Sequence, residues 1–215
     1  MTGKATYHFE GKTILITGGA GDIGKATAHR FAANGAGVVL LDLNEAKLAS
    51  VAQELQAYNV PIGAFRCDVT VSDDVTKAFV GASKQFGRID YVFNNAGYQG
   101  VFAKTNEYPA EDFKKVIDIN VVGVFDVLKA AAQHLRSAGG GAIVNTASYA
   151  GVIGPPNMIA YTASKFAVIG ITQTAAKDLA PYNIRVNSLS PSLIGPGFMW
   201  TRLSRIASSS RVAVL

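Results

Sequence analysis

The sequence contains little cysteine, little charge and no long apolar run. Cys67 is its one cysteine among 215 residues, so no intrachain disulfide can form and nothing indicates an oxidising compartment. Charged residues make up 16% and hydrophobic residues 49%, which excludes disorder as the main state. No apolar run approaches the roughly 18–20 residues of a membrane span, and the N-terminal segment has no apolar signal core. We therefore expect a cytoplasmic protein without a membrane partner.

Patterns for binding metal or nucleic acid are also missing. The 3 histidines are scattered and give no metal-ligand spacing, so no metal site is predicted. The net charge is +5, but residues 199–215 contribute three arginines and no acid, which leaves +2 for the rest of the chain. Because the rest has no basic stripe interleaved with aromatic residues, we expect no nucleic-acid partner.

Short β-branched runs alternate with longer helical patterns, which predicts an α/β fold with a doubly wound parallel sheet of the Rossmann type, in one domain over residues 1–198. The expected strands lie near 12–17, 37–42, 60–66, 89–93, 142–147 and 184–189. The expected helices lie near 22–34, 44–57, 72–86, 109–137 and 160–180, with Asn44 and Ser72 as N-caps and Pro109 in a first turn. Residues 199–215 have no clear period and are predicted to form an atypical tail.

A glycine-rich segment, Thr17–Gly24 (TGGAGDIG), joins the first expected strand to the first expected helix. Glycines there permit positive φ angles and close backbone approach, and the N–H groups that open the helix attract a pyrophosphate. A G-x-G-x-x-G match in this strand–loop–helix context predicts dinucleotide binding, and the alternative is a purely structural turn. The cofactor contacts expected here are Gly18, Gly21, Asp22, Ile23 and Gly24.

The second expected strand ends at Asp42, 18 residues after Gly24. An acid at about this spacing accepts hydrogen bonds from the adenosine ribose, and its charge repels a 2′-phosphate. No Arg or Lys lies in the glycine loop before Lys25 or directly after Asp42 to offset the repulsion, so NAD is favoured over NADP as cofactor. The alternative for Asp42 is a helix cap, a role that Asn44 fills better.

The stretch Tyr161–Lys165 (YTASK) places a phenol and an ammonium four residues apart, on one face of an expected helix. At about 4 Å and an effective dielectric of about 20, the ammonium favours the phenolate by roughly 4 kcal/mol before burial opposes it. This predicts a Tyr161 pKa low enough for general-base catalysis near neutral pH. The alternative is a partly buried amphipathic helix with an exposed lysine.

Over residues 9–198 the chain resembles the short-chain dehydrogenase/reductase family. The matching features are TGGAGDIG, Asp42, CDV at 67–69, NNAG at 94–97, Asn120, Ser148, Tyr161 with Lys165, and IRVNSLSP at 184–191. The resemblance implies an enzyme, an oxidoreductase that transfers a hydride between NAD(H) and a secondary alcohol or ketone.

The resemblance also implies a catalytic role for four positions. Tyr161 is expected as general acid/base, and Lys165 is expected to lower its pKa and to hold the nicotinamide ribose. Ser148 is expected to hydrogen-bond the reacting oxygen, and Asn120 to hold a water that relays protons towards Lys165. The alternatives are a strand-end cap for Ser148 and a satisfied interior amide for Asn120.

Further cofactor contacts are implied by the same resemblance. They are Asp68 and Val69 for the adenine, Asn94, Ala96 and Gly97 after the fourth strand, and Pro191 and Ile194 beside the nicotinamide. For Asp68 and Val69 the alternative is approach to the next helix, and for the NNAG segment it is an ordinary tight turn.

Three features depart from the family pattern. Asp22 stands where a second glycine is usual, and Ser192 follows Pro191 where a glycine is usual. The last helix and strand of the family are not recognisable, so we expect a C-terminally truncated or altered chain. The surface between the expected helices at 109–137 and 160–180 is retained, which predicts a homodimer.

Residues 195–200 (GPGFMW) resemble the substrate side of family members that act on xylitol and related polyols, so a small-molecule polyol is the expected substrate. Two alternatives stay open. One is a 3-oxoacyl-carrier reductase, which a preference for NADPH would favour. The other belongs to a different class: an inactive NAD-binding regulatory or association protein.

Overall fold

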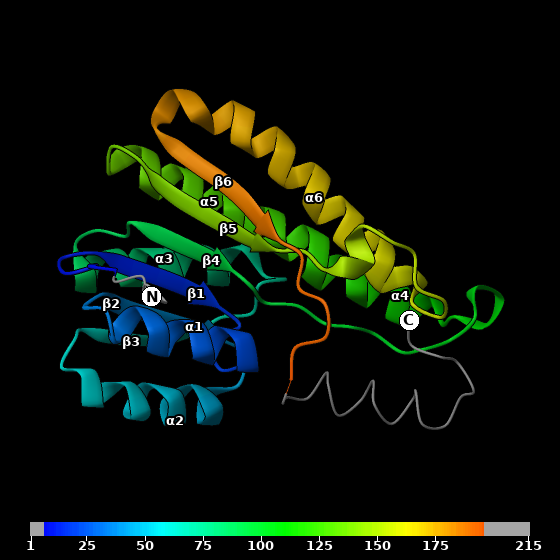
Figure 1. Ribbon diagram of the computed structural model, residues 1–215, viewed down its shortest axis with the longest axis horizontal. Helices are drawn as coiled ribbons and strands as arrows, with labels where there is room; N and C mark the ends of the chain where they lie inside the picture. Colours follow the sequence, from blue (N-terminus) through cyan, green and yellow to red (C-terminus); the bar gives the residue numbers. More distant parts are fainter. Residues whose placement is uncertain (1–6, 196–215) are drawn as a thin grey trace, which may run out of the picture.

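The computed structural model describes residues 7–195, in which strands and helices alternate and all six strands pair in parallel (Figure 1). The strands are β1 (Thr13–Thr17), β2 (Gly37–Asp42), β3 (Ile62–Arg66), β4 (Tyr91–Asn94), β5 (Gly141–Thr146) and β6 (Ile184–Leu189). Their order in the sheet is β3-β2-β1-β4-β5-β6. This is the Rossmann order, in which the direction of winding reverses between β1 and β4. The predicted fold class and all six predicted strands are confirmed.

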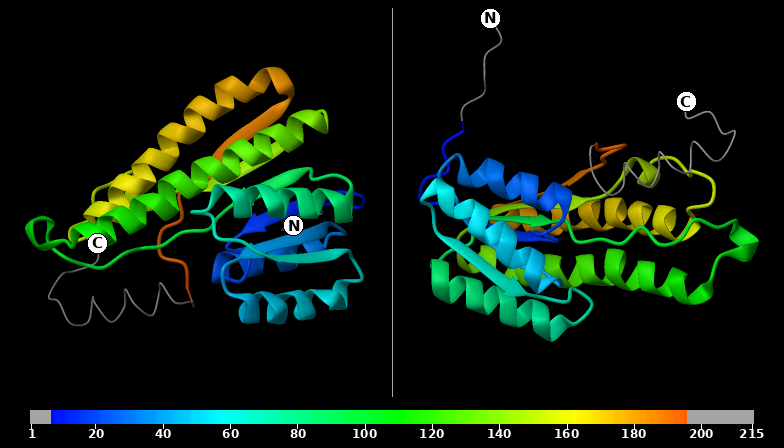
Figure 2. Two further views of the ribbon diagram at one scale, coloured as in Figure 1. Left: turned by 180° about the vertical axis from the view of Figure 1, so that it is seen from behind. Right: turned by 90° about the horizontal axis from the view of Figure 1, so that it is seen from below.

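Helices cover both faces of the sheet, as a doubly wound fold requires. The helices are α1 (Asp22–Ala32), α2 (Glu45–Leu55), α3 (Ser72–Phe86), α4 (Ala110–Ile117), α5 (Gly123–Ser137) and α6 (Ile159–Leu179). The view from behind brings α3 and α5 in front of the sheet, whereas α1 and α2 lie on the opposite face (Figures 1 and 2).

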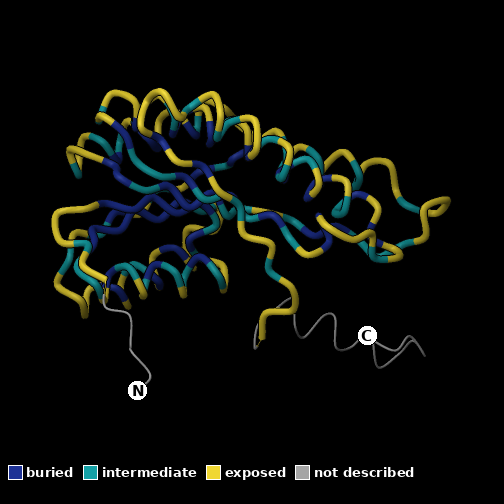
Figure 3. Tube along the Cα trace, turned by 45° about the horizontal axis from the view of Figure 1, so that its top comes forward, coloured by how far each residue is buried: buried dark blue, intermediate teal, exposed yellow. Residues whose placement is uncertain are grey.

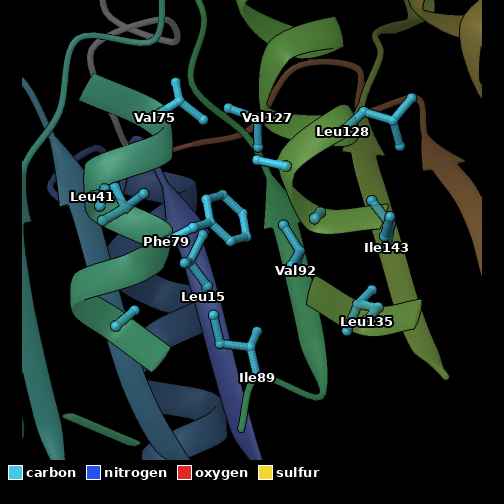
Figure 4. Packing of buried hydrophobic residues seen from close by; sticks show 14 of the residues in the cluster. Leu15, Leu41, Val75, Phe79, Ile89, Val92, Val127, Leu128, Leu135 and Ile143 are labelled. Carbon is cyan, nitrogen blue, oxygen red and sulfur yellow. The ribbon is translucent and has the colours of Figure 1, made fainter. Parts of the chain in front are cut away.

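The strands bury alternate residues on the two faces, which fixes the register of the sheet. In β1, Leu15 points towards α3 and α5, while Ile14 and Ile16 pack on the side of α1 and α2. Figure 4 shows Phe79 of α3 between Leu15 and residues of the central strands. Fully burying a side chain of this kind contributes about 1.5–3 kcal/mol to folding.

The predicted helix caps have different outcomes. Asn44 precedes α2, and its side chain accepts a hydrogen bond from the backbone N–H of Lys47 at 3.0 Å, so this prediction is confirmed. Ser72 was predicted as the cap of α3, which is wrong, because the cap position is Val71 and Ser72 is the first helical residue. The Ser72 hydroxyl instead donates to the Asp126 carboxylate of α5.

The helix predicted over residues 109–137 is not continuous. It consists of α4, then a π-helical turn η3 (Asp118–Val122), then α5. Pro109 lies just before α4 rather than within its first turn. A π turn inserts an extra residue into a helix and often marks a functional position. Here it contains Asn120, whose side chain is fully buried.

The last described strand is covered on one face. Ile184 and Val186 of β6 are buried against the α3, α5 and α6 layer, whereas Arg185 and Asn187 are exposed. The chain that follows β6, up to residue 195, is mostly exposed (Figure 3). The predicted tail at 199–215 and the predicted substrate-side residues 196–200 lie outside the described residues.

Within residues 7–195, no helix has both the length and the apolar composition needed to cross a membrane. The same part of the chain contains no group of three or more His, Cys, Asp or Glu side chains arranged to hold a metal ion.

Candidate functional site

The glycine loop lies at the carboxyl end of β1, against the segment that follows β4. Gly18 has a φ of +62°, and a Cβ built there would lie 3.0 Å from the Cα of Ala96. A side chain at Gly24 would collide with the carbonyl oxygen of Gly18. Both positions therefore require glycine, which keeps the loop close to the start of α1.

The start of α1 provides backbone N–H groups without a side-chain cap. Its N-cap residue is Gly21, which makes no side-chain cap hydrogen bond, and Asp22 is the first helical residue. Asp22 is exposed and Ile23 is half-buried. A helix N-terminus of this kind favours a bound anion such as a phosphate.

The Asp42 carboxylate is fixed beside the glycine loop. One of its oxygens accepts a hydrogen bond from the N–H of Ala20 at 3.1 Å, and the other accepts from the N–H of Asn44 at 3.0 Å. Each oxygen can accept a further bond. Lys25, the first basic residue after the loop, pairs with Glu54 at 2.7 Å. Lys25 is therefore paired with an acid other than Asp42.

Asp68 and Val69 follow β3 and differ in exposure. The Asp68 carboxylate is half-buried and accepts hydrogen bonds from the N–H and the hydroxyl of Thr70, at 3.0 and 2.7 Å. Val69 is buried, and a Cβ on Gly123 of α5 would lie 2.9 Å from its side chain. Val69 therefore packs against the start of α5.

The side chain of Asn94, predicted as a cofactor contact, points into the protein. Its amide nitrogen donates to the carbonyl of Val124 at 2.9 Å and to the side chain of Asn145 at 3.0 Å. The residue is 1% exposed. A cofactor at this end of the sheet would therefore meet the backbone of the segment rather than this amide.

Asn95, which is not among the predicted site residues, joins the two sides of the site. Its side-chain nitrogen donates to the carbonyl of Thr17 at 3.2 Å, and its oxygen accepts from the Thr146 hydroxyl at 3.1 Å. The Thr17 hydroxyl in turn accepts from the N–H groups of Asn95 and Ala96, at 2.9 and 3.0 Å. The NNAG pattern gives the residue types but not these cross-strand partners.

Lys165 of α6 reaches the end of β5. Its ammonium donates to the carbonyl of Thr146 at 2.7 Å and lies 5.5 Å from the centre of the Tyr161 ring. A Cβ built on Gly97 would lie 3.6 Å from this ammonium, so the segment after β4 passes directly beside it. Thr146 and Asn95 thus connect Lys165 to the glycine loop.

Tyr161 and Ser148 lie close together, and the Ser148 side chain acts to lower the pKa of Tyr161. Ser148 follows β5, and its hydroxyl also accepts from the N–H of Ala150 at 3.2 Å. Ser148 therefore caps the short 3₁₀ turn η4 (Tyr149–Gly151) and contacts Tyr161 as well. The two interpretations that the sequence left open for Ser148 are compatible.

The predicted pKa of Tyr161 needs a correction. Burial raises the pKa of Tyr161 above its ordinary value of 10.0, and Ser148 opposes this only in part. Burial also lowers the pKa of Lys165 from 10.5 to about 8. The expected lowering was the effect of an ammonium about 4 Å away before burial opposes it. In the structure burial prevails: Lys165 is 2% exposed and its ammonium donates to a backbone carbonyl.

Both polar atoms of the Asn120 side chain have hydrogen-bond partners. Its oxygen accepts from the N–H of Tyr98 at 2.8 Å, and its nitrogen donates to the carbonyl of Tyr98 at 2.8 Å and to the Ser164 hydroxyl at 3.0 Å. A Cβ built on Gly97 would lie 3.3 Å from the Asn120 oxygen as well as near Lys165. Asn120 is thus a satisfied interior amide that also lies beside the lysine.

The segment after β6 runs back to the start of η4. The carbonyl of Pro191 accepts a hydrogen bond from the N–H of Tyr149 at 2.9 Å. Tyr149 directly follows Ser148 in the chain, so Pro191 lies close to Ser148. Ile194 is 49% exposed. Pro191 is therefore next to the tyrosine site, and Ile194 lies near the end of the described residues.

The fold and the site together define a Rossmann-type oxidoreductase. The model of the short chain dehydrogenase family matches residues 12–206, which is most of the sequence. The chain belongs to the short-chain dehydrogenase family, and the predicted family resemblance is confirmed.

Relatives of this chain act on alcohols or ketones. It is 38% identical over 202 residues to levodione reductase from Leifsonia aquatica, covering 93% of this chain and 74% of the relative. It is 38% identical over 187 residues to a 3-oxoacyl-[acyl-carrier-protein] reductase from Thermotoga maritima, covering 86% and 75%. The chain is therefore an oxidoreductase that acts on an alcohol or ketone.

Among solved structures, an NAD⁺-bound xylitol dehydrogenase is similar to this chain. The TM-score is 0.92 and the sequence identity 48%, with 95% of this chain and 80% of that chain covered.

Proposed function

We propose that this protein oxidises a polyol, or reduces the matching ketone, with NAD(H) as cofactor and Tyr161 as general acid/base. The observation that carries the proposal is the contact of Tyr161 with Ser148 beside the buried ammonium of Lys165, at the carboxyl end of β5. Ligands of open parallel sheets bind at this end of the strands. The similarity to an NAD⁺-bound xylitol dehydrogenase supports both cofactor and substrate class.

The residues at this end of the sheet fit NAD. The glycines of the loop have no side chains to block close approach of a cofactor, and the start of α1 offers backbone N–H donors for its phosphates. The Asp42 carboxylate offers acceptors for the ribose hydroxyls. Because the carboxylate is negative and Lys25 is paired with Glu54, a 2′-phosphate would be repelled. The other residues proposed to hold the cofactor are Asp68, Val69, Ala96, Gly97, Lys165, Pro191 and Ile194, together with the backbone of Asn94.

When bound, NAD would supply the acceptor for the hydride that leaves the substrate carbon. Ser148 would hold the substrate oxygen by a hydrogen bond, and Tyr161 would take the hydroxyl proton from that oxygen. Lys165 would orient the ribose and, as a buried cation, stabilise the Tyr161 phenolate that accepts this proton. Asn120 holds Tyr98 and Ser164 in place and lies beside Lys165, where it is proposed to hold the water of a proton relay.

The pKa directions imply a pH dependence for each direction of the reaction. Burial raises the pKa of Tyr161, so the phenol stays protonated at neutral pH. The protonated form is the proton donor needed for ketone reduction, and the phenolate is the base needed for alcohol oxidation. Oxidation should therefore become faster as the pH rises, and reduction should become slower.

A 3-oxoacyl-carrier reductase is the second candidate, because such an enzyme from Thermotoga maritima is 38% identical. The test is to mix the protein with a panel of polyols, simple alcohols and 3-oxoacyl thioesters, each with NAD(H) and NADP(H), and to follow nicotinamide absorbance. NADH formation from polyols supports the proposal. Selective NADPH use on 3-oxoacyl thioesters would favour the second candidate, and NAD binding without any turnover would favour a regulatory protein.

We further propose a homodimer formed through α5 and α6, in a cytoplasmic protein. Large apolar side chains are exposed on these elements, with Phe125 at 50% and Phe166 at 48%. Light scattering of the wild type and of a Phe125→Glu/Phe166→Glu variant tests this, and a monomeric wild type would contradict it.

A further inference from the structure

Tyr98, Tyr108 and Asp112 form a hydrogen-bonded cluster that none of the proposed reaction steps uses. One oxygen of the Asp112 carboxylate accepts from the Tyr98 hydroxyl at 2.9 Å. The other oxygen accepts from the Tyr108 hydroxyl at 2.6 Å and from the backbone N–H of Val101 at 2.9 Å. One side chain of α4 therefore holds three groups of the β4–α4 segment, residues 95–109, which joins β4 to α4.

The Asp112 carboxylate is ionised at neutral pH and acts only as an acceptor. Burial favours its neutral form, but the hydrogen bonds from Tyr108, Val101 and Tyr98 prevail, so its pKa lies below the ordinary value of 3.8. Burial and the neighbouring Asp112 also raise the pKa of Tyr108, which keeps that hydroxyl a donor. Hydrogen bonds to an ionised acceptor are stronger than bonds between neutral groups, so the cluster is a firm anchor for the segment.

Tyr98 connects this cluster to Asn120. The backbone N–H of Tyr98 donates to the Asn120 side-chain oxygen, and its carbonyl accepts from the Asn120 nitrogen, each at 2.8 Å. Asn120 lies in η3, which directly follows α4. Asp112 therefore holds the side chain of Tyr98, while the backbone of the same residue holds Asn120.

The β4–α4 segment also lies beside the proposed catalytic groups of α6. A Cβ built on Gly97 would lie 3.6 Å from the ammonium of Lys165 and 3.3 Å from the Asn120 oxygen. The Asn120 nitrogen donates to the Ser164 hydroxyl at 3.0 Å, and that hydroxyl donates to the carbonyl of Tyr161 at 2.7 Å. A displacement of the segment would therefore change the surroundings of both Asn120 and Lys165.

We propose that Asp112 is a positioning residue for the reaction: by anchoring the Tyr98 side chain, it keeps the β4–α4 segment where it holds Asn120 beside Lys165. The inference rests on the proposed function, since the groups that it positions are those of the proposed reaction. Most of the proposed cofactor contacts belong to the glycine-loop side of the sheet. Loss of the anchor should therefore lower kcat and leave NADH affinity nearly unchanged.

The test compares Tyr98→Phe with Tyr108→Phe. Each removes one hydroxyl from the same carboxylate, but only Tyr98→Phe removes the anchor of the residue that holds Asn120. With xylitol and NAD, kcat should fall by about 10-fold in Tyr98→Phe, the factor that a hydrogen bond to an ionised group contributes. In Tyr108→Phe, kcat should change by less than about 2-fold, and NADH affinity should stay within about 3-fold of the wild type in both variants.

A purely structural role for the cluster gives a different result. It would lower the thermal midpoint of both variants and would leave their kcat values equal. Equal kcat values in Tyr98→Phe and Tyr108→Phe would therefore overturn the proposal.

Asp112 itself is tested by a pair of substitutions of similar size. Asp112→Leu removes both acceptor oxygens, so kcat should fall further than in Tyr98→Phe. Asp112→Asn keeps one acceptor oxygen and should regain most of that loss. Equal kcat values in these two variants would contradict the proposal, and if Asp112→Leu does not fold, the comparison of the two tyrosine variants decides.

Hydrogen exchange separates this proposal from the proposed function. The amide of residue 98 reports the anchored geometry directly, because its acceptor is the Asn120 oxygen. Measured by NMR without ligand, its protection should fall by about 10-fold in Tyr98→Phe and stay at the wild-type level in Tyr108→Phe. If this difference appears in a protein that oxidises no alcohol, the proposed reaction fails and the anchoring of Asn120 through Asp112 stands. Unchanged protection in Tyr98→Phe would overturn the anchoring even in an active enzyme.

Discussion

The two halves of the sheet differ in what they bury. The glycine-loop half, β1–β3 with α1 and α2, has a mainly apolar interior. The tyrosine half, β4–β6 with η3, α5 and α6, buries polar side chains next to the apolar ones. Of the ten buried polar or charged residues within 7–195, eight lie after residue 89. The comparison separates two tasks: the first half provides a backbone cradle, and the second holds reactive side chains in fixed positions.

The same difference appears in how each half presents its functional groups. In the glycine-loop half, the groups are backbone N–H donors and the half-buried carboxylate of Asp42. In the tyrosine half, Lys165 and Asn120 are almost completely buried and are held by hydrogen bonds. Substitutions in the tyrosine half should therefore affect stability and chemistry together, whereas substitutions at Asp42 should affect cofactor choice alone.

The largest effect on stability is expected for Asn120→Leu. This change leaves the N–H and carbonyl of Tyr98 without their side-chain partner and removes the donor to Ser164. Since each unpaired buried group costs about 1–3 kcal/mol, the free energy of unfolding should fall by about 4 kcal/mol. Urea unfolding followed by circular dichroism measures the loss.

The matched substitution in the glycine-loop half is Asn44→Ala. It removes one exposed cap acceptor of α2, so a loss of about 1 kcal/mol is expected. Equal losses for the two variants would contradict the distinction between the halves.

A pH-dependent effect is expected at Lys165. Burial lowers the pKa of Lys165 from 10.5 to about 8, so between these values the folded state releases a proton that the unfolded state keeps. Relative to Lys165→Met, the wild type should therefore gain stability as the pH rises from about 8 to about 10, by up to about 3 kcal/mol. Below pH 8 the difference should be constant.

Unfolding of both proteins across this pH range checks the slope. Lys84→Met removes one exposed lysine of α3 and controls for the loss of a positive charge. A stability difference between wild type and Lys165→Met that does not change from pH 8 to pH 10 would show that burial does not shift this lysine.

The smallest effect is expected at Asp42, and it concerns specificity. Asp42→Ala should lower the ratio of NAD to NADP affinity by about 10-fold or more, because it removes ribose acceptors and the charge that repels a 2′-phosphate. Asp22→Ala removes an exposed acid from the same loop and should leave the ratio near that of the wild type. Cofactor titrations followed by fluorescence measure both ratios, and an unchanged ratio in Asp42→Ala would refute the ribose role.

Much of the glycine-loop half could be predicted from the sequence. The near-continuous apolar runs of β1 and β2, the glycine loop between β1 and α1, and the cap at Asn44 each have a local signature. Local patterns therefore sufficed where each element depends on its own residues.

The tyrosine half was less predictable because its features depend on distant contacts. The π turn at Asp118–Val122 and the partners of Asn95 come from segments far apart in the chain. The direction of the Tyr161 pKa depends on burial, which spacing along a helix does not reveal. For the same reason, the hydrogen bonds to the Asp112 carboxylate became visible only in the folded chain.

The central claim is that Tyr161 carries the proton while the rest of the site binds the cofactor. It is tested most directly by measuring NADH formation from xylitol by wild type and by Tyr161→Phe, together with NADH binding by fluorescence. Because the phenylalanine keeps the ring and removes the proton carrier, kcat should fall by about 1,000-fold with NADH affinity within about 3-fold of the wild type. Undiminished turnover by Tyr161→Phe, at normal cofactor affinity, would contradict the account.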